Sequence, residues 1–219
     1  MSVISALARR RPHLLAATAG LLGVVGLAAG PISSAGASGG TSFPLFANPS
    51  VVGCLGVEGR PAPTATVTVN PGELNDTMTV RLNHFKPGLA FDLFTVQRSN
   101  QQADGSANPT PGFGLAWYQS DIQVGNSGTA TAHIRTILLN QIFGFDPDVK
   151  LAPTNTFHVG FWFNNPNDAA SCGFTGFTPF NGEHHAGPLA MISRPDAATN
   201  LGPLCTKPDT SAIPATCNP

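Results

Sequence analysis

The sequence contains few charged residues. Asp, Glu, Lys and Arg make up 11% of its 219 residues, against roughly 25% in an average soluble domain. The 11 basic and 12 acidic residues leave a net charge of −1 at pH 7. So little charge excludes the basic surface of a nucleic-acid-binding protein and the charge runs of a disordered tail. It also argues against a coiled coil or a helical bundle, whose exposed faces are rich in Lys and Glu.

Several motifs of enzymes and metal sites are also missing. The sequence has no phosphate-binding P-loop and no Gly-x-Gly-x-x-Gly dinucleotide motif after a strand. It has no Cys-x-x-Cys pair of the kind that holds structural zinc. Carboxylates are scarce, and no spacing favours Asp92, Asp121 or Glu183 as a pair for glycoside chemistry. We therefore assign no catalytic residue.

The first 37 residues have the composition of an export signal. Three arginines at positions 9–11 precede an uncharged apolar stretch over residues 14–29. An Ala-Gly-Ala sequence at residues 35–37 fits the rule for signal-peptide cleavage. The apolar stretch has 16 residues, fewer than the roughly 20 of a spanning helix, which favours cleavage over an anchor. We predict a secreted or cell-envelope protein without a membrane span in its mature chain.

Removing the leader changes the charge balance. Residues 1–37 contain three arginines and no acidic residue, so the mature chain has 11 − 3 = 8 basic and 12 acidic residues, a net charge of −4. This mildly acidic balance predicts no nucleic-acid partner. The remaining chain divides into an N-terminal extension at 38–59, a domain at 60–195 and an irregular, Pro-rich tail at 196–219.

All four cysteines, Cys54, Cys172, Cys205 and Cys217, lie in the predicted mature chain. An even number of cysteines in an exported protein predicts disulfides, here two of them. Cys205 and Cys217 flank a Pro-rich segment without a strand pattern, so pairing them would hold a loose C-terminus. Of the three possible pairings we therefore favour Cys205–Cys217 with Cys54–Cys172.

Apolar and polar residues alternate along most of the mature chain, which is the pattern of half-buried β-strands. Gly, Pro and Asn turns separate the alternating segments, and no helix-length pattern lies between them. The spacing predicts an all-β fold, an antiparallel two-sheet β-sandwich of immunoglobulin-like or jelly-roll-like type with seven to eight strands. The single helix candidate covers residues 137–143. The predicted strands cover residues 64–70, 77–85, 89–98, 115–124, 129–138, 156–164 and 188–194.

The segment 156–164 alternates most clearly. His158 and Trp162 share one of its faces. The other face carries only apolar residues, because consecutive odd positions of a strand point the same way. We predict that the residues of this apolar face belong to the core: Phe157, Val159, Phe161 and Phe163.

Three segments are more distinctive than ordinary strand sequence. They are residues 113–121 (FGLAWYQSD), 158–169 (HVGFWFNNPNDA) and 178–187 (TPFNGEHHAG). Over about residues 113–190 the chain resembles a group of exported actinobacterial proteins without an assigned activity. The resemblance implies a secreted β-domain, and it carries over no catalytic or binding residue.

The aromatic residues suggest a ligand-binding surface. Trp117, Tyr118 and Trp162 are the only Trp and Tyr residues of the chain. On an outer sheet face they could stack on sugar rings, with hydrogen bonds from Asp121 and Asn164. In the alternative interpretation the aromatic rings pack in the core of the sandwich. The first interpretation describes a non-catalytic extracellular module that binds an unidentified glycan or protein and needs no cofactor.

The histidines suggest a second hypothesis. His158, together with Glu183, His184 and His185 in a Gly-bounded loop, could bind zinc or a similar divalent ion in a small metal-dependent enzyme. Adjacent residues of a strand point in opposite directions, so His184 and His185 could both bind an ion only from a loop. In the alternative interpretation the loop histidines face solvent or bond to the backbone.

Overall fold

The structure is a computed structural model, and it describes residues 40–110, 112–139, 157–180 and 185–217. Within these ranges no helix is long and apolar enough to cross a membrane. The elements are β1 (Thr41–Ala47), α1 (Val52–Leu55), β2 (Thr64–Asn70), β3 (Asp76–Asn83), β4 (Ala90–Val96), β5 (Ala116–Gln123), β6 (Ala130–Thr136), β7 (His158–Phe163), the 3-10 helix η1 (Pro166–Cys172), β8 (Leu189–Ile192), β9 (Pro208–Asp209) and β10 (Thr216–Cys217).

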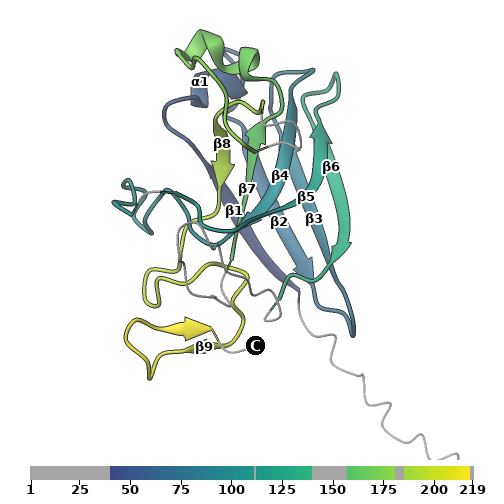
Figure 1. Cartoon of the computed structure of the whole chain (residues 1–219). Helices are drawn as coiled ribbons and strands as arrows, with labels where there is room; N and C mark the ends of the chain where they lie inside the picture. The colour runs from purple at the N-terminus through teal and green to yellow at the C-terminus, as the bar shows by residue number, and fades with distance from the viewer. Residues whose placement is uncertain (1–39, 111, 140–156, 181–184, 218–219) are drawn as a thin grey trace, which may run out of the picture. The chain divides into compact units, whose positions relative to one another are not determined.

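Strands β1 to β8 form a single antiparallel sheet in the order β5-β4-β7-β8-β1-β2-β3-β6 (Figure 1). β5 and β6, at the two ends of this order, lie next to each other, so the sheet is nearly closed and barrel-like. The predicted all-β, antiparallel class is confirmed. The predicted division into two separate sheets is not, because one strand belongs to both halves.

That strand is β1. Its first part, up to Leu45, pairs with β2, while Phe46 and Ala47 pair with β8. β1 lies in the segment 38–59, which was predicted to be an N-terminal extension leading into the domain. Proline lacks the N–H that a strand with two neighbours donates. Where Pro44 lies, β1 has β2 as its only partner, so the proline is tolerated there.

The seven predicted strands correspond to β2 to β8, with ends that differ by a few residues. Of the helix candidate at 137–143, residues 137–139 are described and are not helical, and the rest lie outside the described residues. Helix is limited in the described chain to the short α1 and η1. The tail predicted to be irregular contains the two-residue strands β9 and β10, which pair with each other.

The main core lies inside the curved sheet. The four residues of the apolar face of β7 belong to it and are at most 1% exposed, which confirms the prediction for this strand. The rings of Phe91 and Phe161 are 4.8 Å apart and those of Phe85 and Phe91 are 5.6 Å apart. Burying a side chain of this size contributes about 1.5–3 kcal/mol. The core is therefore the main source of stability in this sheet.

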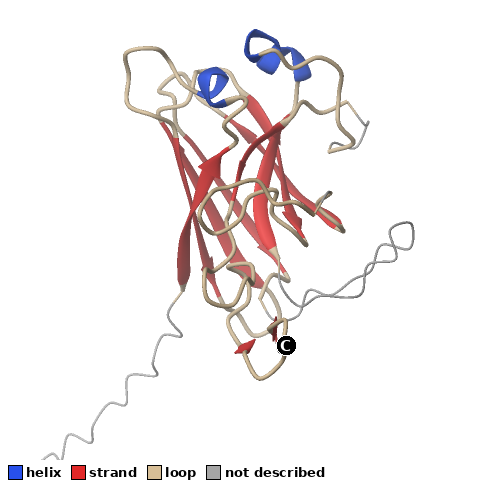
Figure 2. Cartoon of the chain, turned by 90° about the vertical axis from the view of Figure 1, so that its left-hand side faces the viewer, coloured by secondary structure: helices blue, strands red, loops and turns tan. Residues whose placement is uncertain are grey.

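A second buried cluster covers the outer face, which is the face of β4, β7 and β8 turned away from the main core. The loop between β4 and β5 leaves the sheet on the left of Figure 1 and passes in front of the strands in Figure 2. This loop contributes Phe113, and the segment before β8 contributes Phe180. We call these residues the outer cluster: Phe94, Val96, Phe113, Ala116, Trp162, Phe180, Ala186, Leu189 and Ile192.

Both predicted disulfides are present. Cys54–Cys172 joins α1 to η1 with a Cα–Cα distance of 6.1 Å, and Cys205–Cys217 closes the C-terminal segment with a distance of 5.7 Å. On the loop-entropy model each contributes roughly 3–5 kcal/mol by restricting the unfolded chain. Two disulfides are typical of a protein that folds in an oxidising compartment.

Candidate functional site

Polar side chains from three neighbouring strands meet on the outer face, and we call them the Tyr118 patch: Asp92, Tyr118, Asp121 and Asn164. β4 lies between β5 and β7, so Asp92 is directly opposite Asp121 on one side and Trp162 on the other. Asn164 follows β7, and its Nδ2 donates a hydrogen bond of 2.9 Å to Asp92 Oδ1. The patch thus spans β5, β4 and the end of β7.

A β-bulge brings the two β5 residues of the patch together. Tyr118 and Asp121 are three positions apart, so regular alternation would point them to opposite faces. The register between β4 and β5 shifts between Leu93 and Phe94, and Gln119 is the extra residue on β5. Tyr118 then lies opposite Phe94 and Asp121 opposite Asp92. Bulges of this kind redirect side chains and are frequent next to functional sites.

Tyr118 is the accessible ring of the patch, with 48% of its surface exposed. Its hydroxyl donates a hydrogen bond of 2.8 Å to Asp121 Oδ1. Its ring meets that of Phe94 edge to face at 5.6 Å, and Phe94 meets Trp162 in the same way at 5.6 Å. The ring is therefore held at its hydroxyl and along one side while half of it remains in water.

Asp92 lies beneath the patch and is 2% exposed. Its burial raises the pKa of the carboxyl to about 6, Asp121 adds to the rise, and the hydrogen bond from Asn164 opposes it. Asp92 Oδ2 receives no hydrogen bond from any described residue. A proton held between Asp92 and Asp121 would supply the missing hydrogen bond.

The neighbouring charges also act on the phenol. Burial, the hydrogen bond to Asp121 and the charges of Asp121 and Asp92 raise the pKa of Tyr118 to about 12. Tyr118 therefore keeps its proton at neutral pH and serves as the donor to Asp121. No positively charged group of the described residues contributes to the pKa of Asp92 or of Tyr118. The patch is consequently a site of negative potential.

The two carboxyls differ in accessibility. A glycoside hydrolase places two carboxyls on either side of the bond that is cleaved. Asp92 is 2% exposed and Asp121 is exposed, so a sugar arriving from solvent meets one carboxyl only. The arrangement suits binding through hydrogen bonds and charge.

Asp92 was not among the predicted site residues. It occurs in an otherwise apolar strand, residues 89–96 (LAFDLFTV), where a charged residue must find a polar environment. The presence of Asp92 within this apolar run was the sequence feature that could have marked it as a site residue. The partners of Asp92 on β5 and after β7 lie about 30 and 70 residues away, and sequence spacing does not identify them.

Trp117 does not join the patch, although it is 54% exposed. It lies opposite Thr95, the next residue after Phe94, and Thr95 is completely buried on the inner side of β4. Adjacent residues of a strand point to opposite faces. The two exposed aromatic residues of β5 therefore lie on different faces of the sheet.

Trp162 is buried and forms the centre of the outer cluster. It is 1% exposed, and its ring stacks on Phe180 at 4.0 Å with an angle of 4° between the planes. Phe113 meets it edge to face at 5.0 Å. The position of Trp162 gives it a packing role and no contact with a ligand. Trp162 supports the Tyr118 patch through Phe94.

His158 is also buried, at 4% exposed, and its Nδ1 lies 3.1 Å from Ser193 Oγ and 3.2 Å from the Ser193 carbonyl oxygen. Burial lowers the pKa of His158 to about 4, and the bond to Ser193 opposes the shift. An imidazole held in this way is a neutral structural group at physiological pH.

The described part of the histidine loop lies at the other end of β7. Gly187 donates a hydrogen bond to the carbonyl oxygen of Phe163, five residues from His158 and thus about 16 Å along an extended strand. His185 is exposed and lies 5.4 Å from the Phe177 ring. The structure does not bring His158 and His185 together. Glu183 and His184 lie outside the described residues.

No group of three or more His, Cys, Asp or Glu side chains in the described chain is arranged to hold a metal ion. His158 and His185 alone do not form a metal site, and the hypothesis that includes Glu183 and His184 stays a prediction because these two residues lie outside the described residues. Of the residues predicted to bind a ligand, Asp121 accepts a hydrogen bond from Tyr118 and Asn164 donates one to Asp92, and both Asp121 and Asn164 are exposed.

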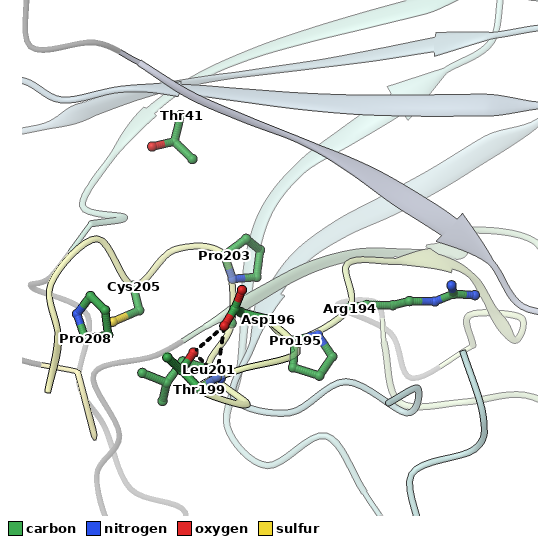
Figure 3. A pocket seen from close by; sticks show the side chains of 10 residues that line it. Thr41, Arg194, Pro195, Asp196, Thr199, Leu201, Pro203, Cys205 and Pro208 are labelled. Carbon is green, nitrogen blue, oxygen red and sulfur yellow. Dashed lines mark hydrogen bonds between the residues drawn. The ribbon is translucent and has the colours of Figure 1, made fainter. Parts of the chain in front are cut away.

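A separate pocket of about 450 Å³ lies near the C-terminal segment (Figure 3). Its polar groups are used within the protein. Asp196 Oδ1 accepts hydrogen bonds from the backbone of Ala198 and Thr199 and from the Thr199 hydroxyl. Arg194 points away from them, donates to Gln101 and lies 3.9 Å from the centre of the Phe46 ring. The pocket is left with mainly apolar and proline surfaces.

Comparison with known proteins adds no family to these observations, since no protein-family model, curated protein or solved structure matches the chain. The Tyr118 patch and its surroundings are therefore the features that bear on function.

Proposed function

We propose that this protein is an exported, non-catalytic module that binds a glycan through the Tyr118 patch. The observation that carries the proposal is an exposed aromatic ring fixed beside hydrogen-bonding groups. The C–H face of a sugar ring packs on an aromatic side chain, and its hydroxyls donate to carboxylates. Tyr118 offers the ring, while Asp121 and Asn164 offer the polar contacts.

Preorganisation favours this use of the patch. The Tyr118 ring is already held by Phe94 and by the hydrogen bond to Asp121. Asn164 is held by Asp92, which is buried below it. Side chains ordered before binding lose little further conformational freedom when a ligand arrives.

Export is part of the same proposal. Two disulfides favour an oxidising location, and the leader composition and the resemblance to exported actinobacterial proteins favour secretion. Glycans are abundant outside cells. A small disulfide-bonded domain with an exposed ring beside acceptors is consistent with contact to such a polymer.

Two neighbouring residues provide a matched experiment. Tyr118 and Trp117 are adjacent, similarly exposed aromatic residues on opposite faces of β5. The full chain, with both disulfides formed, is screened on an array of soluble oligosaccharides, and the bound glycan is titrated by calorimetry. Tyr118→Ala should weaken binding at least about tenfold, or 1.4 kcal/mol, and Trp117→Ala should leave it unchanged. Equal binding by both variants would contradict the proposal.

A further inference from the structure

The charge of the Tyr118 patch is unbalanced within the described chain. Asp92 and Asp121 are directly opposite each other on antiparallel strands. Like charges in this arrangement repel each other and weaken the pairing. No described cation contributes to the pKa of Asp92 or Tyr118, and the predicted mature chain has more acidic than basic residues.

One oxygen of the pair lacks a donor. Asp92 is 2% exposed, its Oδ1 accepts from Asn164, and its Oδ2 has no hydrogen-bond partner among the described residues. A buried carboxylate oxygen without a donor is costly unless a proton or a cation compensates it. Asp121 above it is exposed, so a cation arriving from solvent meets Asp121 first and also reduces the repulsion from Asp92.

We propose that the Tyr118 patch selects glycans that carry a free amino group, such as oligomers of glucosamine, by binding the ammonium group between the Tyr118 ring and Asp121. The inference rests on the proposed glycan-binding function and narrows its ligand class. An ammonium donates up to three hydrogen bonds and is attracted to the face of an aromatic ring. The patch supplies an exposed carboxylate, an exposed ring and a buried second carboxyl.

A sugar amine fits these groups better than a bare divalent ion. Calcium takes six to eight oxygen ligands, and magnesium demands octahedral geometry. The patch provides two carboxylates, and the described chain holds no group of three acidic, His or Cys side chains for a metal. An ammonium group needs fewer protein ligands because part of its shell is aromatic surface or water.

Three oligosaccharides with the same β-1,4 backbone test the inference. Tetramers of glucosamine, N-acetylglucosamine and glucose differ at one ring substituent, which is an ammonium, an acetamide or a hydroxyl group. Each is titrated by calorimetry at pH 6 and low salt into the full chain with both disulfides formed. We expect the glucosamine tetramer to bind at least about tenfold more tightly than the other two.

Three variants locate the effect. Asp121→Asn should abolish the preference for the amine, and Asp92→Asn should reduce it, since each removes a negative charge of the pair. Glu73→Gln removes an equal charge from an exposed position between β2 and β3, and it should leave the preference intact. Thermal unfolding of each variant shows whether a loss of binding comes from a loss of folding.

The outcomes distinguish a failure of the amine preference from a failure of the proposed glycan-binding function. Equal affinity for the three tetramers, with binding lost in Tyr118→Ala, overturns the amine preference and keeps the glycan-binding function. If the wild-type protein binds none of the three tetramers, the amine preference is overturned, and if it also binds no glycan on the array, the glycan-binding function is overturned as well. Equal affinity for tetralysine, or full displacement of the sugar by millimolar calcium, also overturns the inference, because the patch would then bind cations without regard to the sugar.

Discussion

The two faces of β4 and β7 are both buried, but different kinds of neighbours cover them. On the inner face Phe91 and Phe161 meet at 4.8 Å among side chains from other strands of the same sheet. On the outer face Trp162 stacks at 4.0 Å on Phe180, which comes from the irregular segment before β8. The inner face of these two strands is almost entirely apolar, whereas the outer face includes Asp92 and His158.

This difference bears on where function can lie. On the inner face the side chains of the curved sheet pack against one another, so solvent does not reach them. Loops cover a face incompletely, and at the rim of the outer cluster Tyr118 remains 48% exposed beside buried Asp92. Binding residues commonly lie on irregular segments that a rigid scaffold supports. The outer face combines such segments with the rigid strands β4, β5 and β7.

The largest expected effect comes from the inner face. Phe161→Ala removes a fully buried ring, so it should lower the free energy of unfolding by about 4 kcal/mol. Phe180→Ala removes a half-buried loop ring from the outer cluster and should cost about 1–2 kcal/mol. Urea denaturation of the two variants gives both values. Equal losses would mean that the loop cover is as strongly packed as the main core.

His158 should make the outer face sensitive to acid. Its folded-state pKa of about 4 lies below the usual value of 6.5. The neutral form therefore contributes stability that is complete above pH 6.5 and is lost as the pH falls toward 4, by about 3 kcal/mol. His158→Asn keeps a donor for Ser193 and cannot titrate. Its stability should lose this slope, as urea denaturation at pH 4.5 and 7 can measure.

Asp92 should produce a slope of the opposite sign. Its folded-state pKa of about 6 lies above the usual value of 3.8, so the folded protein holds a proton that the unfolded chain releases. Stability from this group is complete below pH 3.8 and is lost as the pH rises to 6. Asp92→Asn should therefore raise stability at pH 7 by about 2 kcal/mol and change little at pH 3.5.

Glu73→Gln is the control for this variant, because it removes an exposed carboxylate of equal charge. The slopes of His158 and Asp92 overlap between pH 4 and 6, where they oppose each other in the wild-type protein. Single variants are needed to separate them. If the free energy of unfolding does not change with pH in the wild-type protein or in either variant, the pKa shifts assigned to His158 and Asp92 are both wrong.

The smallest expected effect is that of Tyr118→Phe. The variant loses the hydrogen bond to Asp121 at a half-exposed position, which should change the free energy of unfolding by about 0.5 kcal/mol. Glycan binding should fall more, since the hydroxyl also fixes the ring and Asp121. A thermal melt and a calorimetric titration of the same sample compare the two effects. A large loss of stability would place Tyr118 with the core residues.

Much of the inner face was predictable from the sequence. The apolar residues at alternate positions, among them Val159 and Phe161, identified the core side of β7, because strand geometry fixes which residues share a face. The pairing of Cys205 with Cys217 followed from the short, patternless segment between them. β1 was not predicted, and its place is fixed by pairing with β2 and with β8, which is distant in the sequence.

The outer face was less predictable. Alternation places Trp162 opposite the core side, but it cannot show that Phe180 will cover it. Tyr118 and Asp121 were candidates by residue type, whereas Asp92 was not. The two described members of the histidine hypothesis, His158 and His185, do not meet, since His158 and the base of the loop lie at opposite ends of β7.

The sequence by itself determined the all-β class, the strands β2 to β8, the apolar side of β7 and the disulfide pairing. These features depend on local periodicity and on chain entropy, which act along the chain. The tertiary structure alone decided that β1 joins the two halves of the sheet and that the bulge at Gln119 sets Tyr118 and Asp121 on one face. Such features depend on strand register and on loops that cover distant strands, and both are settled only when segments far apart in the sequence pack together.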